Sequence, residues 1–166
     1  ACRKSKAKYM LAENYPYRRE LQMVREMVRQ GLFGKLYYAE GEYLHELKWE
    51  GINTPWRRKW LFGIDGITYG THSLGPILQW MEGDRVTRVC CAGSGYNHID
   101  DANKAYEASD TCVMLCQMQS GGLARVRVDM LSDRPYSMRN YQLQGTDGCY
   151  ESARTPDGKH LIWLKS

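Results

Sequence analysis

Long apolar runs are absent from this sequence of 166 residues, and none approaches the roughly 18 consecutive apolar residues that spanning a bilayer requires. The first residues, ACRKSKAKYML, carry charges but have neither a long apolar segment nor a small-residue cleavage site, so we expect no secretion signal within them. A basic stripe is also absent, because the 23 lysines and arginines are scattered among 19 acidic residues. We therefore expect neither a membrane nor a nucleic acid as a partner.

The six cysteines lack the spacing of a metal site. No C-x-x-C pair occurs, and no histidine–cysteine spacing fits zinc. Cys90 and Cys91 are adjacent, whereas Cys112 and Cys116 lie in an apolar run, where buried thiols are common. The sequence therefore predicts reduced thiols, no metal and a cytoplasmic location, with export left open because the chain starts inside a predicted helix.

The first half of the chain alternates predicted strands and helices. Residues 1–7 are typical of the end of a helix, and the apolar segment 8–13 favours a strand. Residues 35–47 form a tyrosine-rich strand, and a second helix is expected over 71–81, beginning at Thr71 or restarting at Pro76. Between the first two strands, a helical stripe ends at a glycine C-cap: Leu21, Val24, Met27, Val28 and then Gly31.

The second half of the chain is a series of predicted strands. Residues 123–131 alternate, with small and apolar side chains facing inward and Arg125, Arg127 and Asp129 facing out. The remaining strands are expected over 85–92, 109–118, 136–145, 149–152 and 160–164. This order predicts one α+β domain over 1–166, with an open, mostly antiparallel sheet whose second half forms a meander. Since the chain begins in a helix and stops after a strand, we expect a fragment of a longer protein.

Two tyrosine–histidine pairs are the candidate proton-transfer groups. Tyr43 and His45 are two residues apart on a predicted strand, and Tyr69 and His72 are three apart near a predicted helix, so each pair lies on one face of its element. Glu13 ends an apolar segment, where a carboxylate needs a partner. Each residue also has a structural interpretation: a histidine bonding a carbonyl, aromatic packing, or a glutamate capping a turn.

Two long segments, YMLAENYPYRRELQMVREMVRQGLFGKLYYAEGEYLHE and GITYGTHSLGPILQW, resemble the C-terminal domain of the Gfo/Idh/MocA oxidoreductases. The resemblance is close over about 1–95 and looser beyond. It implies an open sheet with helices on one face, which shapes a sugar site and packs against another subunit as a homo-oligomer. It also implies NAD or NADP, bound mainly by a Rossmann domain. This chain has neither the glycine fingerprint nor the family's Glu-Lys-Pro segment.

One departure separates the chain from ordinary dehydrogenases of that family. They carry an aspartate four residues before the catalytic histidine, whereas this chain has Thr68. The combination of Glu13, Tyr43-x-His45 and Tyr69-x-x-His72 is instead similar to the family's NAD-dependent glycoside hydrolases. In that branch a hydride leaves the sugar, an elimination breaks the glycosidic bond and the hydride returns, with tyrosine and histidine as acid and base.

Three functions are therefore compared. The leading hypothesis is the substrate domain of a sugar oxidoreductase, with NAD or NADP oxidising a ring hydroxyl whose proton goes to a catalytic residue. The second is a NAD-dependent glycosidase, and the third is a non-catalytic sugar-binding or dimerisation module. We expect the fragment alone to be inactive. The predicted catalytic residues are His72, Tyr69, His45 and Tyr43, and the predicted carbohydrate-binding residues are Glu13, Trp56, Arg57 and Tyr150.

Overall fold

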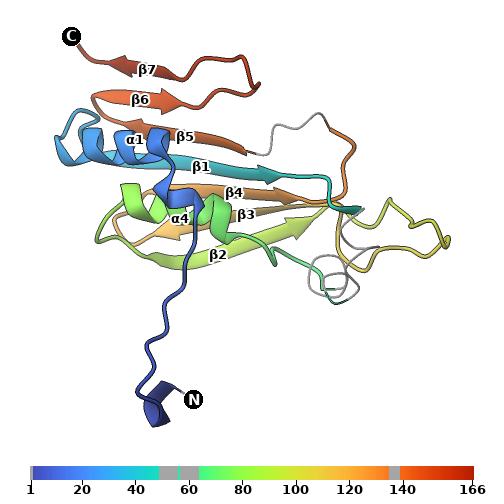
Figure 1. Ribbon diagram of the computed structural model, residues 1–166. Coiled ribbons are helices and arrows are strands. Elements are labelled where there is room, and N and C mark those ends of the chain that lie inside the picture. The colour runs from blue at the N-terminus through green and yellow to red at the C-terminus, as the bar shows by residue number, and fades with distance from the viewer. Residues whose placement is uncertain (1, 49–55, 57–63, 135–138) are drawn as a thin grey trace.

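In its described residues, the chain forms a seven-stranded sheet with the helices α1 and α4 on one face (Figure 1). The computed structural model describes residues 2–48, 56, 64–134 and 139–166. The helices are α1 Arg19–Arg29 and α4 Thr71–Trp80, and short 3-10 turns cover Cys2–Lys4 and Tyr15–Tyr17. The strands are β1 Leu36–Leu44, β2 Val86–Gly93, β3 Thr111–Met118, β4 Leu123–Asp129, β5 Arg139–Gly145, β6 Gly148–Glu151 and β7 Leu161–Leu164.

The sheet order is β2-β3-β4-β1-β5-β6-β7. Only the β1–β4 pair is parallel among the described strands, so the predicted α+β class with a mostly antiparallel sheet is confirmed. The predicted uninterrupted meander is wrong, because β1 lies between β4 and β5. Ala39, Tyr43 and Leu44 are buried, and a strand buried to this extent needs a hydrogen-bonded neighbour along each edge.

The core lies between the sheet and the two helices. Leu21 and Val24 of α1 are almost completely buried, as the helical stripe predicted, and Gly31 ends the helix at a φ of 75°. The indole N–H of Trp80 donates a hydrogen bond of 3.0 Å to the carbonyl of Leu21, which joins α4 to α1. Since burying a large aromatic side chain contributes about 1.5–3 kcal/mol, Trp80 is a main element of this core.

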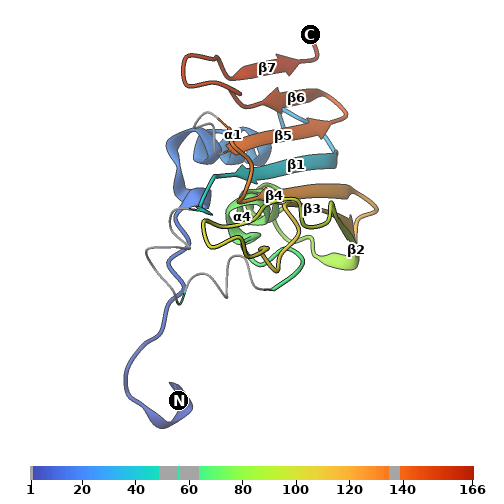
Figure 2. The same ribbon diagram turned by 90° about the vertical axis from the view of Figure 1, so that its right-hand side faces the viewer.

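The predicted strand over 8–13 is wrong. This segment has no ladder partner among the described residues, and Tyr9, Met10 and Leu11 are 76%, 80% and 72% exposed. Figures 1 and 2 show it running away from the sheet. A strand without a neighbour has no partner for its backbone N–H and C=O groups, so apolar character alone does not make one. The predicted helix end over 1–7 is likewise limited to one 3-10 turn at Cys2–Lys4.

The opposite face of the sheet carries charges in place of helices. Arg125 of β4 lies 2.6 Å from Glu40 and 3.2 Å from Glu42 of the neighbouring β1. The predicted outward direction of Arg125 and Arg127 holds, but Asp129 and Glu42 are only 4% and 5% exposed. These carboxylates are held within a network and not solvated singly. Contact of this face with another subunit stays a prediction.

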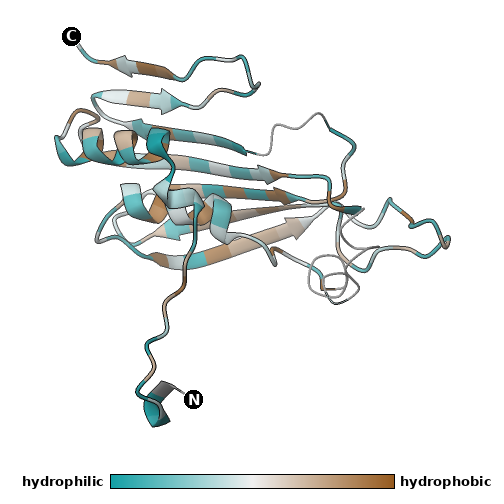
Figure 3. Ribbon diagram, viewed as in Figure 1, coloured by the Kyte–Doolittle hydropathy of each residue, from teal (hydrophilic) through white to brown (hydrophobic). Residues whose placement is uncertain are grey.

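The outer strand β7 carries apolar residues, as the colouring of Figure 3 shows. Its side chains are also exposed, between 36% for Ile162 and 51% for Trp163. No helix in the described part of the chain is long and apolar enough to cross a membrane.

The five cysteines whose side chains are described are free thiols, and Cys112 and Cys116 are buried as predicted. The described residues also contain no group of three metal-ligating side chains.

Candidate active site

His72, in the first turn of α4, faces the carboxylate of Glu13. Nδ1 of His72 lies 2.8 Å from Oε1 of Glu13, and the two side chains are only 13% and 18% exposed. Nδ1 of His72 is buried and faces this carboxylate, and the contact becomes an ion pair when the imidazole is protonated. The same oxygen accepts the backbone N–H groups of Asn14 and Tyr15 at 3.0 and 3.2 Å, and the side chain of Thr71 bonds the carboxylate as well. The carboxylate is therefore fixed before any ligand binds.

Three tyrosine rings surround the imidazole of His72. Tyr15 stacks on it with centroids 4.0 Å apart and planes 20° apart, whereas Tyr43 and Tyr69 approach edge-on at 5.0 and 4.8 Å. Tyr43 and Tyr69 also contact each other, at 5.2 Å. These residues come from the 3-10 turn, from β1 and from the loop before α4, so the fold brings together segments distant in sequence. We name Glu13, Tyr15, Tyr43, Tyr69 and His72 the His72 cluster.

His45 extends the His72 cluster through Tyr43. The hydroxyl of Tyr43 and Nδ1 of His45 are 2.8 Å apart, which is hydrogen-bonding distance. The backbone of His45 continues the β1–β4 pairing, because its N–H donates to the carbonyl of Asp129 at 2.8 Å. The predicted same-face placement of Tyr43 and His45 is therefore present, and it produces a direct contact.

Burial and charge set the acid strength of the cluster. Burial lowers the pKa of His72, and the positive charge of Arg139 lowers it further, although Glu13 acts in the opposite direction. Burial tends to raise the pKa of Glu13, but its hydrogen bonds to Thr71 and the backbone, together with His72, hold that pKa below its ordinary value. At neutral pH the cluster thus holds an ionised carboxylate beside a neutral imidazole.

A proline explains how the backbone of His72 is held. Pro76 lies inside α4 and has no N–H, so the carbonyl of His72, four residues earlier, loses its usual helical donor. The hydroxyl of Tyr141 replaces that donor, at 2.6 Å from the His72 carbonyl oxygen. A residue of β5 thereby fixes the first turn of α4, and with it the imidazole.

Two glycines permit the close packing that forms the cluster. A Cβ on Gly41 would lie 2.2 Å from the carbonyl oxygen of Ser73, so only glycine lets α4 approach β1 this closely. A Cβ on Gly75 would lie 2.9 Å from Pro16, whose ring follows Tyr15. Both contacts set the distance between the helix that carries His72 and the segments that carry Tyr43 and Tyr15.

The structure unites five of the eight predicted site residues: Glu13, Tyr43, His45, Tyr69 and His72. Tyr150 lies apart from them, with its hydroxyl 2.8 Å from Nδ1 of His160 and its ring against Trp80. Trp56 is 64% exposed, and Arg57 lies outside the described residues. The roles of these three residues in substrate binding stay predictions.

Sequence reasoning did not identify Tyr15, Tyr141 and Arg139 as part of the site. Arg139 places its guanidinium over the ring of Tyr15, 5.0 Å from the centroid. Tyr15 follows Glu13 by two residues, so its position near Glu13 could have been predicted from the sequence. The positions of Arg139 and Tyr141 could not, because only the pairing of β5 with β1 brings them to the cluster.

Comparison with known proteins places these residues in a family. The profile of the glycosyl hydrolase 109 C-terminal domain matches residues 17–163. A glycosyl hydrolase family 109 protein of Saccharopolyspora erythraea is 34% identical over 84% of this chain and 34% of its own length. An alpha-N-acetylgalactosaminidase of Shewanella oneidensis is 36% identical over 85% of this chain and 35% of its own. The chain therefore spans about a third of the length of these curated relatives.

Solved structures share the fold at low sequence identity. The WlbA dehydrogenase of Bordetella pertussis, in complex with NADH and UDP-GlcNAcA, superposes with a TM-score of 0.75 at 19% identity, covering 99% of this chain and 50% of that one. The aldose-aldose oxidoreductase of Caulobacter crescentus, complexed with glycerol, gives 0.72 at 18% identity, covering 98% and 47%. The chain thus belongs to the glycosyl hydrolase 109 family, as a C-terminal domain of the Gfo/Idh/MocA type.

Proposed function

We propose that this chain is the substrate side of a NAD-dependent glycosidase acting on an N-acetylhexosaminide. The observation that carries the proposal is the composition of the His72 cluster. Ordinary glycosidases need two carboxylates flanking the scissile bond. Among the described residues, this cluster contains one carboxylate, Glu13, already paired with His72. Histidine and tyrosine must then supply the acid and base chemistry, as elimination beside a transiently oxidised carbon requires.

His72 acts as the first base in this proposal. Its lowered pKa keeps the imidazole neutral at neutral pH, so it can accept the proton of a sugar hydroxyl. Glu13 then stabilises the imidazolium that forms and fixes the ring orientation, because its carboxylate is within 2.8 Å of Nδ1. The stacked ring of Tyr15 excludes water from one face of the imidazole.

Tyr43 and His45 form the second proton-transfer pair. In the elimination, the imidazole of His45 would take the proton from the carbon beside the oxidised one, and the phenol of Tyr43 would give its proton to the leaving oxygen as the C–O bond breaks. The hydrogen bond between the two side chains then returns a proton from the imidazole to the phenol. Tyr69 adjoins Tyr43 and His72, where it can bind a sugar hydroxyl between the two pairs. These roles assign His72 with Glu13 to one proton transfer and Tyr43 with His45 to the other.

The nicotinamide cofactor would supply reversible hydride acceptance at one ring carbon of the sugar. The described residues do not fit its phosphate end, since Gly93-Ser94-Gly95 ends β2 and leads into an irregular segment in place of a helix. They do fit a sugar held for oxidation, because a neutral base and a phenol lie side by side in the His72 cluster. This chain would therefore contribute the substrate end, with the dinucleotide held by another part of the protein.

Position 68 favours the glycosidase over a net dehydrogenase. The dehydrogenases that the sequence resembles have an aspartate there, whereas Thr68 is exposed and brings no carboxylate toward His72. Without that second carboxylate, no acidic side chain at position 68 can carry the proton from His72 to solvent. This suits a reaction in which His72 gives the proton back to the sugar before the product leaves. The alpha-N-acetylgalactosaminidase name of a relative gives the first substrate to test.

The test uses the longer protein with its dinucleotide-binding part. We expect an aryl α-N-acetylgalactosaminide to release its phenol without net accumulation of NADH, and the freed sugar to carry solvent deuterium when the reaction runs in D2O. His72→Asn should lower kcat/KM by about 10²–10⁴-fold, the usual contribution of a general base. His98→Asn is the matched control, since His98 pairs with Asp110 in the loop after β2. Net NADH formation would support the dehydrogenase instead, and a protein that binds no dinucleotide would be a non-catalytic module.

A further inference from the structure

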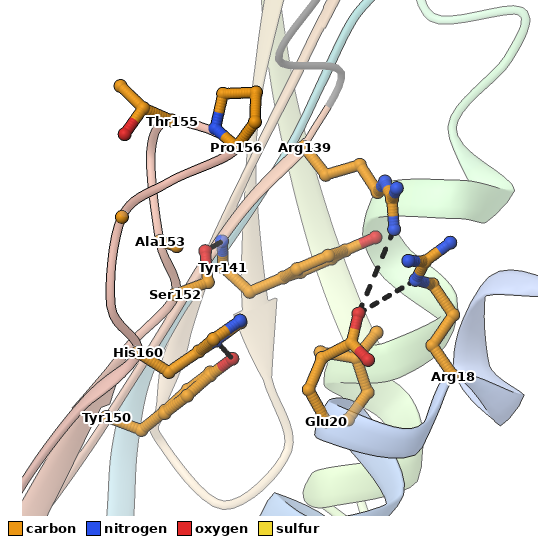
Figure 4. Close-up of a pocket in the computed structure, with 12 residues that line it drawn as sticks. Arg18, Glu20, Arg139, Tyr141, Tyr150, Ser152, Ala153, Thr155, Pro156 and His160 are labelled. Atoms are coloured by element: carbon orange, nitrogen blue, oxygen red, sulfur yellow. Dashed lines mark hydrogen bonds and ion pairs between the residues drawn. The ribbon is translucent and has the colours of Figure 1, made fainter.

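A cavity of about 270 Å³ lies between α1 and the β5–β6 edge of the sheet (Figure 4). Two of its lining residues, Arg139 and Tyr141, also contact members of the His72 cluster. Its volume is near the lower end of small-ligand pockets, which begin at roughly 300 Å³. It therefore suits one sugar-sized ring. The cavity is lined by residues of the segment around α1, by residues of the sheet and by small residues of the β6–β7 connection. The larger lining residues are Arg18, Glu20, Arg139, Tyr141, Tyr150 and His160.

Charge in the cavity is unbalanced. Arg18 and Arg139 supply two guanidiniums, and Glu20 is the one carboxylate in the lining. Nε of Arg18 bonds Glu20 at 2.8 Å, whereas Nη1 of Arg139 is 3.8 Å away, beyond hydrogen-bonding distance. Figure 4 shows both arginines directed at this carboxylate from separate elements.

Arg139 keeps its hydrogen-bond donors available. No described residue accepts a hydrogen bond from its guanidinium, although the side chain is only 22% exposed. A guanidinium has five donors in a planar fork, which matches the two oxygens of a carboxylate. A partly buried fork of donors with one distant ionic partner among the described residues therefore suits an oxyanion, which accepts hydrogen bonds.

The rest of the wall suits the ring that would carry such a group. The imidazole of His160 is nearly parallel to the ring of Tyr150, with 8° between the ring planes. A hydrogen bond of 2.8 Å joins Nδ1 of His160 to the hydroxyl of Tyr150. Ala153 and Gly158 lack bulk, so the β6–β7 connection leaves space above these rings. Aromatic surfaces with neighbouring polar groups are typical of small-molecule sites.

We propose that this cavity binds a carboxylate-bearing sugar ring, with Arg139 and Arg18 holding the carboxylate. Its position makes it a subsite for an acidic unit next to the sugar held at His72, and this second part rests on the proposed function. Tyr141 joins the two places, because its ring lines the cavity while its hydroxyl bonds the His72 carbonyl. Arg139 joins them as well, through the Tyr15 ring that stacks on His72.

The test measures binding to this chain by calorimetry and NMR, with D-glucuronate as the probe and D-glucose as the neutral match. We expect glucuronate to bind at least about tenfold more tightly, because charge-assisted bonds to Arg are about twice as strong as neutral ones. Its carboxylate should shift the Nε–H resonance of Arg139. Equal binding of the two sugars, or no glucuronate binding, would overturn the proposal.

Variants locate the site. Arg139→Gln and Arg139→Lys should each weaken glucuronate binding by about tenfold, the lysine variant through loss of the fork at constant charge. Glu20→Gln should tighten it, since the competing carboxylate is gone. Arg29→Gln is the matched control on α1, where that arginine pairs with Glu82 outside the cavity. An Arg29→Gln effect as large as that of Arg139→Gln would overturn the assignment, as would weaker binding in Glu20→Gln.

These readouts are independent of the proposed glycosidase. Glucuronate binding does not require a dinucleotide or turnover, so a protein that hydrolyses no glycoside can still show it. Conversely, hydrolysis of an aryl glycoside with no glucuronate binding would remove the subsite and leave the proposed function in place. If both hold, glycosides whose leaving sugar carries a carboxylate should be hydrolysed with a lower KM than their neutral counterparts.

Discussion

At His72, burial and the charge of Arg139 oppose protonation while Glu13 favours it. The balance lies on the side of the neutral ring, which is the state that the proposed role of His72 as a base requires. Replacing Glu13 with Gln removes the one group among these that favours the imidazolium. The side chain stays close in size and keeps an oxygen for the backbone N–H groups of Asn14 and Tyr15.

We therefore predict that Glu13→Gln lowers the pKa of His72 further. A two-dimensional NMR titration of the histidine side chains would measure it, and Glu26→Gln is the control, because Glu26 is exposed on α1 and bonds Gln30. A pKa of His72 that stays constant or rises in Glu13→Gln would show that the carboxylate does not act on the imidazole as its 2.8 Å distance indicates.

The same burial predicts a pH dependence of stability. The folded pKa of His72 is below the ordinary value of 6.5. Above that value both the folded and the unfolded states hold a neutral ring, so His72 adds no pH dependence. As the pH falls below it, the unfolded chain takes up the proton first, and the free energy of unfolding decreases until the folded pKa is passed. Urea unfolding at a series of pH values should show this decrease in the free energy of unfolding. The part of the decrease that is due to His72 should be absent in His72→Gln and present in His98→Gln.

Spacing in the sequence was sufficient for the residues that share an element. Tyr43 lies on β1, whose pairing with β4 continues through His45, so the period of two predicted the contact between them. Tyr69 lies in the loop before α4, so its contact with His72 does not follow from the helical period. Spacing was also not sufficient for Arg139, which faces Tyr15 only because β5 pairs with β1. The contacts of Tyr150 were not predictable either, because its place on a strand does not show that its ring packs against Trp80, and its role in substrate binding stays a prediction.

At the scale of elements, α4 is held by a contact from the sheet that compensates for its own proline. Pro76 cannot donate to the carbonyl of His72, and Tyr141 does so in its place. Removing that hydroxyl leaves a partly buried carbonyl without its donor, at a cost of about 1–3 kcal/mol. This loss would destabilise the first turn of α4, where His72 lies.

We predict that Tyr141→Phe lowers the free energy of unfolding by about 1–3 kcal/mol. In a Pro76→Ala background the restored N–H can bond the His72 carbonyl, so the same substitution should cost less there. Urea unfolding of the four proteins in this double-mutant cycle measures the coupling, with Tyr37→Phe as the control, because Tyr37 is 49% exposed on β1. If the changes in the free energy of unfolding caused by Tyr141→Phe and Pro76→Ala are additive, Tyr141 does not replace the missing helical donor.

Elements with a strong local signal were predictable, and those defined by a neighbour were not. The stripe of α1 and its final Gly31 determine a helix locally, whatever surrounds it. The apolar segment 8–13 satisfies the same local criteria for a strand, yet a strand is completed only by another backbone. The position of β1 between β4 and β5 is a tertiary fact of the same kind, since nothing in the order of strands along the chain encodes it.

At the scale of the whole molecule, the two faces of the sheet are stabilised differently. The face under α1 and α4 is apolar and close-packed, whereas the other holds Glu40, Glu42 and Arg125 in a partly buried network. Burying a charge is favourable only when its partner is present, because desolvation is not recovered otherwise. Arg125 is central to this network, since it serves both carboxylates.

We predict that Arg125→Met lowers the free energy of unfolding by about 2–3 kcal/mol, below the 3–5 typical of fully buried pairs, because Arg125 is 29% exposed. Glu42, with a side chain only 6% exposed, would keep just the longer contact to Arg154 at 3.8 Å. Adding Glu42→Gln to Arg125→Met should recover part of the loss by removing the buried charge. Urea unfolding measures each step, with Arg88→Met on β2 as an exposed control. A double variant less stable than Arg125→Met would mean that Glu42 stabilises this face through contacts other than its charge.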